Sequence, residues 1–119
     1  MNDLISYETV AKVLRRIADE QPNRKVSTYR YLVCGEPSCL IAVLLERLGV
    51  DREVMRELDR EDASQGAKMI SLSRHKLWDD FDKQARVLMQ SAQMSQDNGC
   101  NWKTAVEYAI QVAEKVDLK

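Results

Sequence analysis

The fold is decided by residues 85–113, which read ARVLMQSAQMSQDNGCNWKTAVEYAIQVA. Two apolar stripes with the 3.6-residue period of a helix lie on either side of Asn98-Gly99, a strong chain-reversal signal. Asn101 stands where the second helix needs an N-cap. That helix buries one face, made of Trp102, Ala105, Val106, Ala109, Ile110, Ala113 and Val116. Because the link is so short, we expect the two helices to be antiparallel neighbours.

The first stripe of this hairpin extends upstream. Its members are Leu77, Trp78, Phe81, Ala85, Leu88, Met89 and Ala92. Ser73 is the expected N-cap, so the pattern predicts one long helix from residue 73 to Asn98. Asp79, Asp80 and Asp82 would then form the polar face of its first turns, where acidic side chains favour the helix dipole.

The N-terminal half predicts shorter elements. A helix with Ser6 as N-cap ends before Pro22. Residues 24–33, RKVSTYRYLV, are rich in β-branched and aromatic residues and predict a short strand or extended segment with no assigned partner.

Residues 34–50, CGEPSCLIAVLLERLGV, predict a central helix. Pro37 suits its first turn, the following residues are apolar nearly all round, and Gly49 suits a left-handed C-terminal position. Asp51 would cap a further, amphipathic helix that buries Val54, Met55 and Leu58. The chain is therefore expected to be a single, mainly all-α domain over residues 1–119. It would be a compact bundle of about five helices with one short extended or β element and a C-terminal helix hairpin.

Composition narrows the function classes. Lys and Arg number 18 against 19 Asp and Glu, so the net charge is −1. This balance creates no overall field for nucleic acid or an anionic membrane. Apolar runs are too short to span a bilayer, and the N-terminus has no signal-peptide pattern, which predicts a cytoplasmic protein with no membrane partner.

Three cysteines and one histidine offer the most direct chemistry. Cys34, Cys39, Cys100 and His75 could form a Cys₃His zinc site, although they lie on different elements. Alternatively, Cys39 could be a nucleophile at a helix start with His75 as its base. Cysteine is often buried as a small hydrophobe, and we favour that interpretation. We therefore expect no catalytic residue, no bound metal and no cofactor.

A local basic patch is the second candidate site. It combines Tyr29 and Tyr31 with five basic residues, Arg15, Arg16, Arg24, Lys25 and Arg30. Basic side chains interleaved with aromatics are what single-stranded nucleic acid requires. Nearby acidic residues dilute this patch, so nucleic-acid binding is the alternative to the function favoured below.

Two segments resemble small proteins encoded by actinobacterial phages and their hosts. The matching positions are Gly35, Pro37, Cys39, Leu48, Gly49 and Val50, then Ala92, Gln93, Gln96, Asp97, Gly99, Trp102 and Ala105. The chain departs from that group at Ala42, where glycine is frequent, and lacks the group's histidine-containing turn. The resemblance implies a fold and a genomic setting, and no reaction.

The resemblance directs attention to Gln93, Gln96, Asp97 and Trp102. In one interpretation they organise the helix hairpin, with Asp97 capping the last helix and Trp102 packing on Met94 or Ala92. In the other they form a polar notch for a partner. Together with Tyr29 and Tyr31 they are the candidate interaction residues. We predict a small non-catalytic protein–protein interaction module, phage-encoded and acting on a host factor, with self-association into a homodimer as a further expectation.

Overall fold

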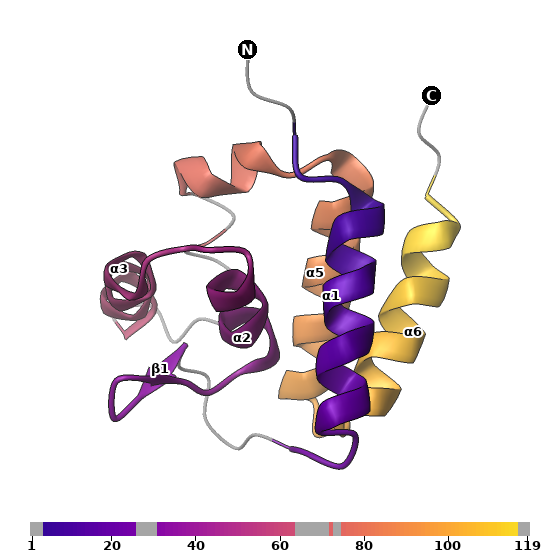
Figure 1. Cartoon of the computed structure of the whole chain (residues 1–119), viewed down its shortest axis with the longest axis horizontal. Coiled ribbons are helices and arrows are strands. Elements are labelled where there is room, and N and C mark those ends of the chain that lie inside the picture. The colour runs from indigo at the N-terminus through magenta and orange to yellow at the C-terminus, as the bar shows by residue number, and fades with distance from the viewer. Residues whose placement is uncertain (1–3, 26–30, 64–71, 73–74, 117–119) are drawn as a thin grey trace.

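A computed structural model describes residues 4–25, 31–63, 72 and 75–116 of the chain (Figure 1). Its elements in chain order are α1 (Tyr7–Glu20), β1 (Leu32–Val33), β2 (Glu36–Pro37), α2 (Leu40–Arg47), α3 (Arg52–Ala63), a 3₁₀ helix η1 (Lys76–Asp80), α5 (Lys83–Asp97) and α6 (Trp102–Glu114). The prediction of a mainly helical bundle with one small β element is confirmed.

Three helices, α1, α5 and α6, stand side by side and form one layer of the molecule (Figure 1). α5 and α6 make the most extensive contact, which confirms the predicted C-terminal hairpin. The turn between them ends α5 with Gly99 at φ +98°, and the Cys100 N–H donates to the Ser95 carbonyl at 3.0 Å. Asn101 caps α6 as expected, since its Oδ1 accepts from the Thr104 N–H at 2.8 Å.

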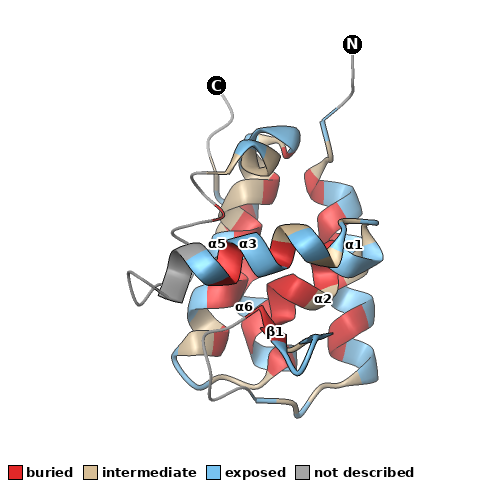
Figure 2. Cartoon of the chain, turned by 90° about the vertical axis from the view of Figure 1, so that its left-hand side faces the viewer, coloured by how far each residue is buried: buried red, intermediate tan, exposed pale blue. Residues whose placement is uncertain are grey.

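α2 crosses this layer and lies between it and α3 (Figures 1 and 2). Five of its residues are buried, Leu40, Ile41, Ala42, Leu44 and Leu45, so the predicted central helix is confirmed. Gly49 adopts φ +91°, and the Val50 N–H donates to the Leu45 carbonyl at 2.9 Å. The left-handed glycine predicted at this position thus closes the helix in a Schellman motif, which satisfies the last carbonyls of α2.

The start of α2 differs from the sequence prediction. Pro37 is not in the first helical turn; it pairs with Leu32 in an antiparallel two-stranded hairpin. Cys34 and Gly35, at φ +54° and +79°, form the tight turn that joins the strands. The end of the predicted extended segment, Leu32–Val33, therefore pairs with the residues that follow it, and residues 26–30 of that segment lie outside the described residues. α2 begins only at Leu40, with Cys39 as its N-cap residue.

The long helix expected from Ser73 is also interrupted. Ser73 lies outside the described residues, and the chain forms η1 before Phe81 becomes extended, at φ −106° and ψ +145°. Phe81 makes a parallel bridge with Ile5. The physical reason is Asp82, whose Oδ1 accepts from the Ala85 N–H at 2.7 Å and whose Oδ2 accepts from the Tyr7 N–H at 3.0 Å. One carboxylate thus accepts hydrogen bonds from the first turns of both α5 and α1.

Candidate functional site

Residues 35–50 and 92–105 meet in the interior, at the first turn of α2. Gln96 accepts a hydrogen bond from the Leu40 N–H at 2.7 Å, and Gln93 accepts one from the Ile41 N–H at 3.3 Å. The first N–H groups of a helix have no partner within it, and Cys39 makes no side-chain cap bond. The two amides on α5 therefore perform the capping from a distant part of the chain.

Asp97 continues this interior cluster instead of capping the last helix. Its Oδ1 accepts from Gln96 Nε2 at 2.8 Å. The first N–H groups of α6 find other acceptors: Trp102 donates to the Arg24 carbonyl at 2.9 Å and Lys103 to the Pro22 carbonyl at 3.1 Å. The prediction that Asp97 caps α6 was wrong, because the loop after α1 occupies that position.

Trp102 is fully buried, and its main polar neighbour is a guanidinium group. Arg24 lies 4.3 Å from the centroid of the Trp102 ring, and its Nη2 donates to the Ser38 carbonyl at 3.0 Å. Of the two predicted neighbours, Ala92 belongs to the same buried core as Trp102, whereas Met94 is 58% exposed. Arg24 therefore joins α6 to the segment before α2, and this contact takes it out of the predicted nucleic-acid patch.

Most of the predicted interaction residues are internal. Gln93, Gln96, Trp102 and Tyr31 are all at most 2% exposed, Asp97 is half-buried, and Tyr29 lies outside the described residues. Those that the structure describes present little surface to a partner in this conformation. Their contacts fit the structural interpretation, in which these residues organise the hairpin and the start of α2.

Asp59 is an interior polar residue that the sequence interpretation missed. Its Oδ1 accepts from the Tyr31 N–H at 2.7 Å and its Oδ2 from the Leu32 N–H at 3.0 Å. It anchors the β-hairpin to α3. A signal was present, because Asp59 follows Met55 by one helical turn and so falls on the apolar stripe of that helix.

The four candidate metal ligands are not brought together. Cys34 is exposed at the hairpin turn, Cys39 is buried and Cys100 is half-buried. His75 caps η1, accepting from the Leu77 N–H at 3.0 Å, and its Nε2 lies 3.6 Å from Glu57. Among the described residues no group of three or more histidine, cysteine or acidic side chains could hold a metal ion.

Cys39 is also unsuited to be a nucleophile. Its exposure is 1%, and burial raises the pKa of the thiol to about 12. The helix N-terminus would lower the pKa of an exposed thiol, but here desolvation outweighs that effect. The buried-hydrophobe interpretation is supported.

This burial predicts the outcome of thiol labelling. In a Cys34→Ser, Cys100→Ser protein at pH 8, Cys39 should react with a disulfide reagent on the order of 10³-fold more slowly than a small reference thiol, because only its thiolate attacks. Denaturant should restore the rate. Labelling of the folded protein at the reference rate would show that Cys39 is accessible and ionised.

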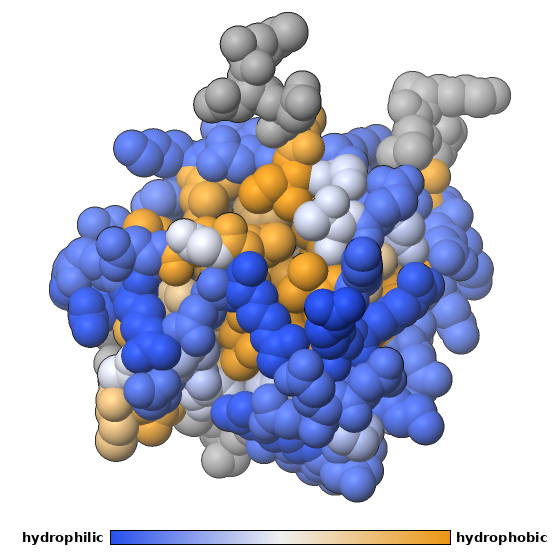
Figure 3. Space-filling view, viewed as in Figure 1, coloured by the Kyte–Doolittle hydropathy of each residue, from blue (hydrophilic) through white to orange (hydrophobic). Residues whose placement is uncertain are grey.

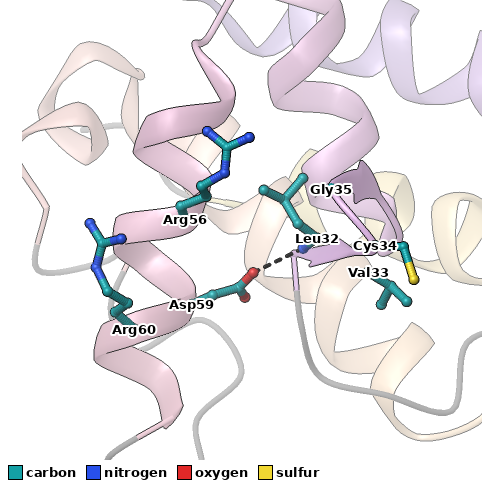
Figure 4. Close-up of a pocket in the computed structure, with 7 residues that line it drawn as sticks. All are labelled: Leu32, Val33, Cys34, Gly35, Arg56, Asp59 and Arg60. Carbon is teal, nitrogen blue, oxygen red and sulfur yellow. Dashed lines mark hydrogen bonds between the residues drawn. The ribbon is translucent and has the colours of Figure 1, made fainter.

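A cleft between the β-hairpin and α3 is one of the surface hollows that described residues line (Figure 4). Its volume is about 520 Å³, and it is lined by Leu32, Val33, Cys34, Gly35, Arg56, Asp59 and Arg60. Asp59 points at the backbone of Leu32, and the Cys34 sulfur points away from both guanidinium groups (Figure 4). Arg56 pairs with Glu53 at 2.9 Å, and Arg60 lies 3.8 Å from the same residue. The charges of this cleft are therefore largely balanced.

A second hollow, of about 380 Å³, lies between α3 and η1. It is lined by Val54, His75, Lys76, Leu77 and Asp80. Lys76 and Asp80 give it one charge of each sign, so it is balanced as well.

The third hollow, which we name the basic hollow, lies between α1 and the end of α2. Its volume is about 310 Å³, and it is lined by Lys12, Val13, Arg16 and Arg47. Arg47 forms a close ion pair with Glu20, and this hydrogen bond lowers the pKa of the Glu20 carboxyl. Lys12 and Arg16 form no ion pair with any residue that the structure describes. Three cations thus surround the half-buried Val13. Arg47 is paired with Glu20, Arg16 acts on the same carboxylate only at longer range, and Lys12 has no ion pair among the described residues.

The surroundings of the basic hollow are partly apolar. On the face of the molecule that carries α1 and α2, apolar side chains gather in the middle, between the two helices, with strongly hydrophilic side chains beside them (Figure 3). Arg15, Arg16 and Lys25 of the predicted nucleic-acid patch are exposed, and Arg30 is outside the described residues. Only Arg16 of that set lines the hollow, whereas Lys12 and Arg47 were not in the predicted set.

Comparison with protein-family models, curated proteins and solved structures finds no match to this chain. No helix in the described ranges has both the length and the apolar character needed to cross a membrane.

Proposed function

We propose that this chain is a small, non-catalytic protein-binding module and that the basic hollow is its binding surface. One observation carries the proposal: Lys12 and Arg16 stand unpaired beside the half-buried Val13. Protein interfaces combine an apolar centre with desolvated arginine contacts, and a hollow provides a place for a partner side chain.

The structural positions of the other candidate residues support a binding role. The polar residues shared with the phage group cap α2 from within, and Cys39 is buried with a raised pKa. Each has a structural role. The resemblance leads us to propose further that the module is phage-encoded and acts on a host factor in the cytoplasm.

The charge of the basic hollow also bears on self-association. A two-fold dimer through this surface would place the same cations of two copies opposite each other, which is unfavourable. We therefore propose a different chain as the partner of this surface, and a homodimer, if formed, would use another face.

Photo-crosslinking in cells tests the function. A benzophenone amino acid in place of Val13 should crosslink to a specific protein in the native host, and adding Arg16→Glu should reduce the crosslinked product at least about 10-fold, because it reverses an unpaired charge. Arg15→Glu is the matched control, since Arg15 is exposed on the same helix but does not line the hollow. No crosslinked protein, or equal loss with both variants, would contradict the proposal.

A further inference from the structure

We propose that the basic hollow recognises an acidic helical segment, with two carboxylates one helical turn apart and an aliphatic side chain beside them. This inference rests on the proposed function and adds the chemistry of the partner. It follows from the spacing of the cations, their unbalanced charge and the apolar floor between the helices.

The spacing comes from α1 itself. Lys12 and Arg16 are four residues apart, so they project from the same helix face, with their Cβ atoms about 5–6 Å apart. A partner helix that lies along α1 repeats this spacing in its own residues four apart. Two glutamates so placed can each meet one cation at the same time.

The charges favour an acidic ligand. Like charges four residues apart on a helix repel each other, and no described acidic side chain pairs with Lys12 or Arg16. Arg47 adds a third cation from the opposite wall and already holds Glu20. The Arg47–Glu20 pair is an internal example of carboxylate binding at this site, since the guanidinium group of Arg47 donates two parallel hydrogen bonds to the carboxylate oxygens of Glu20.

The apolar floor favours a peptide over a nucleic-acid backbone. Val13 is half-buried in the hollow, and apolar surface continues between α1 and α2 (Figure 3). An aliphatic side chain of a helix would cover it, as in other helix-in-groove complexes. Single-stranded nucleic acid would need aromatic stacking platforms, and the described residues that line the hollow include no aromatic side chain.

The inference can be tested by NMR with defined probes. The ligand is a synthetic alanine-based helical peptide with two glutamates four residues apart and a leucine between them, and the protein is the full chain. We expect amide shift changes at Lys12, Val13, Arg16 and Arg47. Replacing both glutamates by glutamine, or the leucine by serine, should weaken binding at least about 10-fold and 3-fold, respectively.

Protein variants supply the matched comparison. Arg16→Glu should abolish the shift changes, whereas Arg15→Glu should alter the dissociation constant less than about 2-fold. Inorganic phosphate and a single-stranded oligonucleotide serve as further ligands. Shifts of equal size with phosphate alone would reduce the site to a free-anion site, and tighter binding of the oligonucleotide would favour nucleic acid; either result would overturn the inference.

Failure of the inference can be told apart from failure of the proposed function. If the glutamine peptide binds as well as the acidic one, or no shifts arise at millimolar peptide, the acidic helix is excluded. The proposed function would still be supported if a host protein crosslinks at Val13 and the product is lost with Arg16→Glu. In that case the crosslinked segment of the host protein would contain no acidic residues. The absence of any such crosslink would remove the function as well.

Discussion

Asp59→Asn is expected to lower the free energy of unfolding by about 3 kcal/mol. The carboxylate accepts the Tyr31 and Leu32 N–H groups, one on each oxygen, and Asp59 is only 7% exposed. Asparagine has the same shape but one acceptor oxygen, so its NH₂ group would face a backbone donor. A buried N–H would lose its partner, and the charge that strengthens the other bond would be gone.

Urea unfolding followed by circular dichroism measures this effect as a lower midpoint with an unchanged slope. Asp19→Asn is the matched control, because Asp19 is exposed on α1 and should change stability by less than about 0.5 kcal/mol. Equal stability of the two variants would show that Asp59 does not anchor the hairpin. Local loosening of residues 31–37 should also appear as faster amide exchange in Asp59→Asn.

The parts of the fold that could be predicted depend on local signals. Ser6 and Asn101 cap their helices through N–H groups three residues away, and Gly49 closes α2 within its own turn. Such contacts are encoded by residue type and short spacing, so sequence alone identifies them. The apolar stripes of α5 and α6 are equally local, which is why the hairpin was predicted.

The parts that could not be predicted depend on distant residues. Gln96 and Gln93 cap α2 across 56 and 52 residues of sequence. The expected long helix is broken where Phe81 bridges Ile5 and Asp82 reaches Tyr7, 75 residues away. Hydrophobic periodicity does not reveal such long-range pairing, since the pattern of apolar residues is the same whether or not the helix is interrupted.

The candidate site shows the same division. The sequence identified Gln93, Gln96 and Trp102 as candidate residues. Their burial could not be predicted, because it depends on how α2 crosses α5. The basic hollow joins Lys12 and Arg16 to Arg47 of α2, and this pairing of elements exists only in the folded chain. A list of basic residues ordered by sequence therefore included Arg24, which is held on Trp102, and omitted Lys12 and Arg47.

Trp102→Ala is expected to have the largest effect on stability, a loss of about 3–5 kcal/mol. The side chain is fully buried in the core, and its removal leaves a cavity that the neighbouring helices can fill only in part. It also removes the surface on which Arg24 rests, so the loop after α1 would lose one of its contacts with α6.

Trp102→Phe separates the contribution of ring size to stability from that of the indole N–H group. The buried indole Nε1 has no hydrogen-bond partner among the described residues, so phenylalanine loses no hydrogen bond there. The cost should be that of the smaller ring together with a weaker contact to Arg24, about 1–2 kcal/mol in total. A cost close to that of alanine would contradict this account and would indicate that the indole N–H is satisfied.

A double-mutant cycle then isolates the Arg24 contact. Arg24→Ala, Trp102→Phe and the double variant should give a coupling energy of about 0.5–1 kcal/mol, since phenylalanine is a weaker cation–π partner than tryptophan. The Arg24 bond to the Ser38 carbonyl contributes equally to both halves of the cycle and cancels. Coupling near zero would mean that Arg24 supports the fold through its hydrogen bonds to Ser38 and Gln21 and not through the indole ring. Measurable coupling would establish the guanidinium–indole stack as the link between the loop after α1 and the first turn of α6.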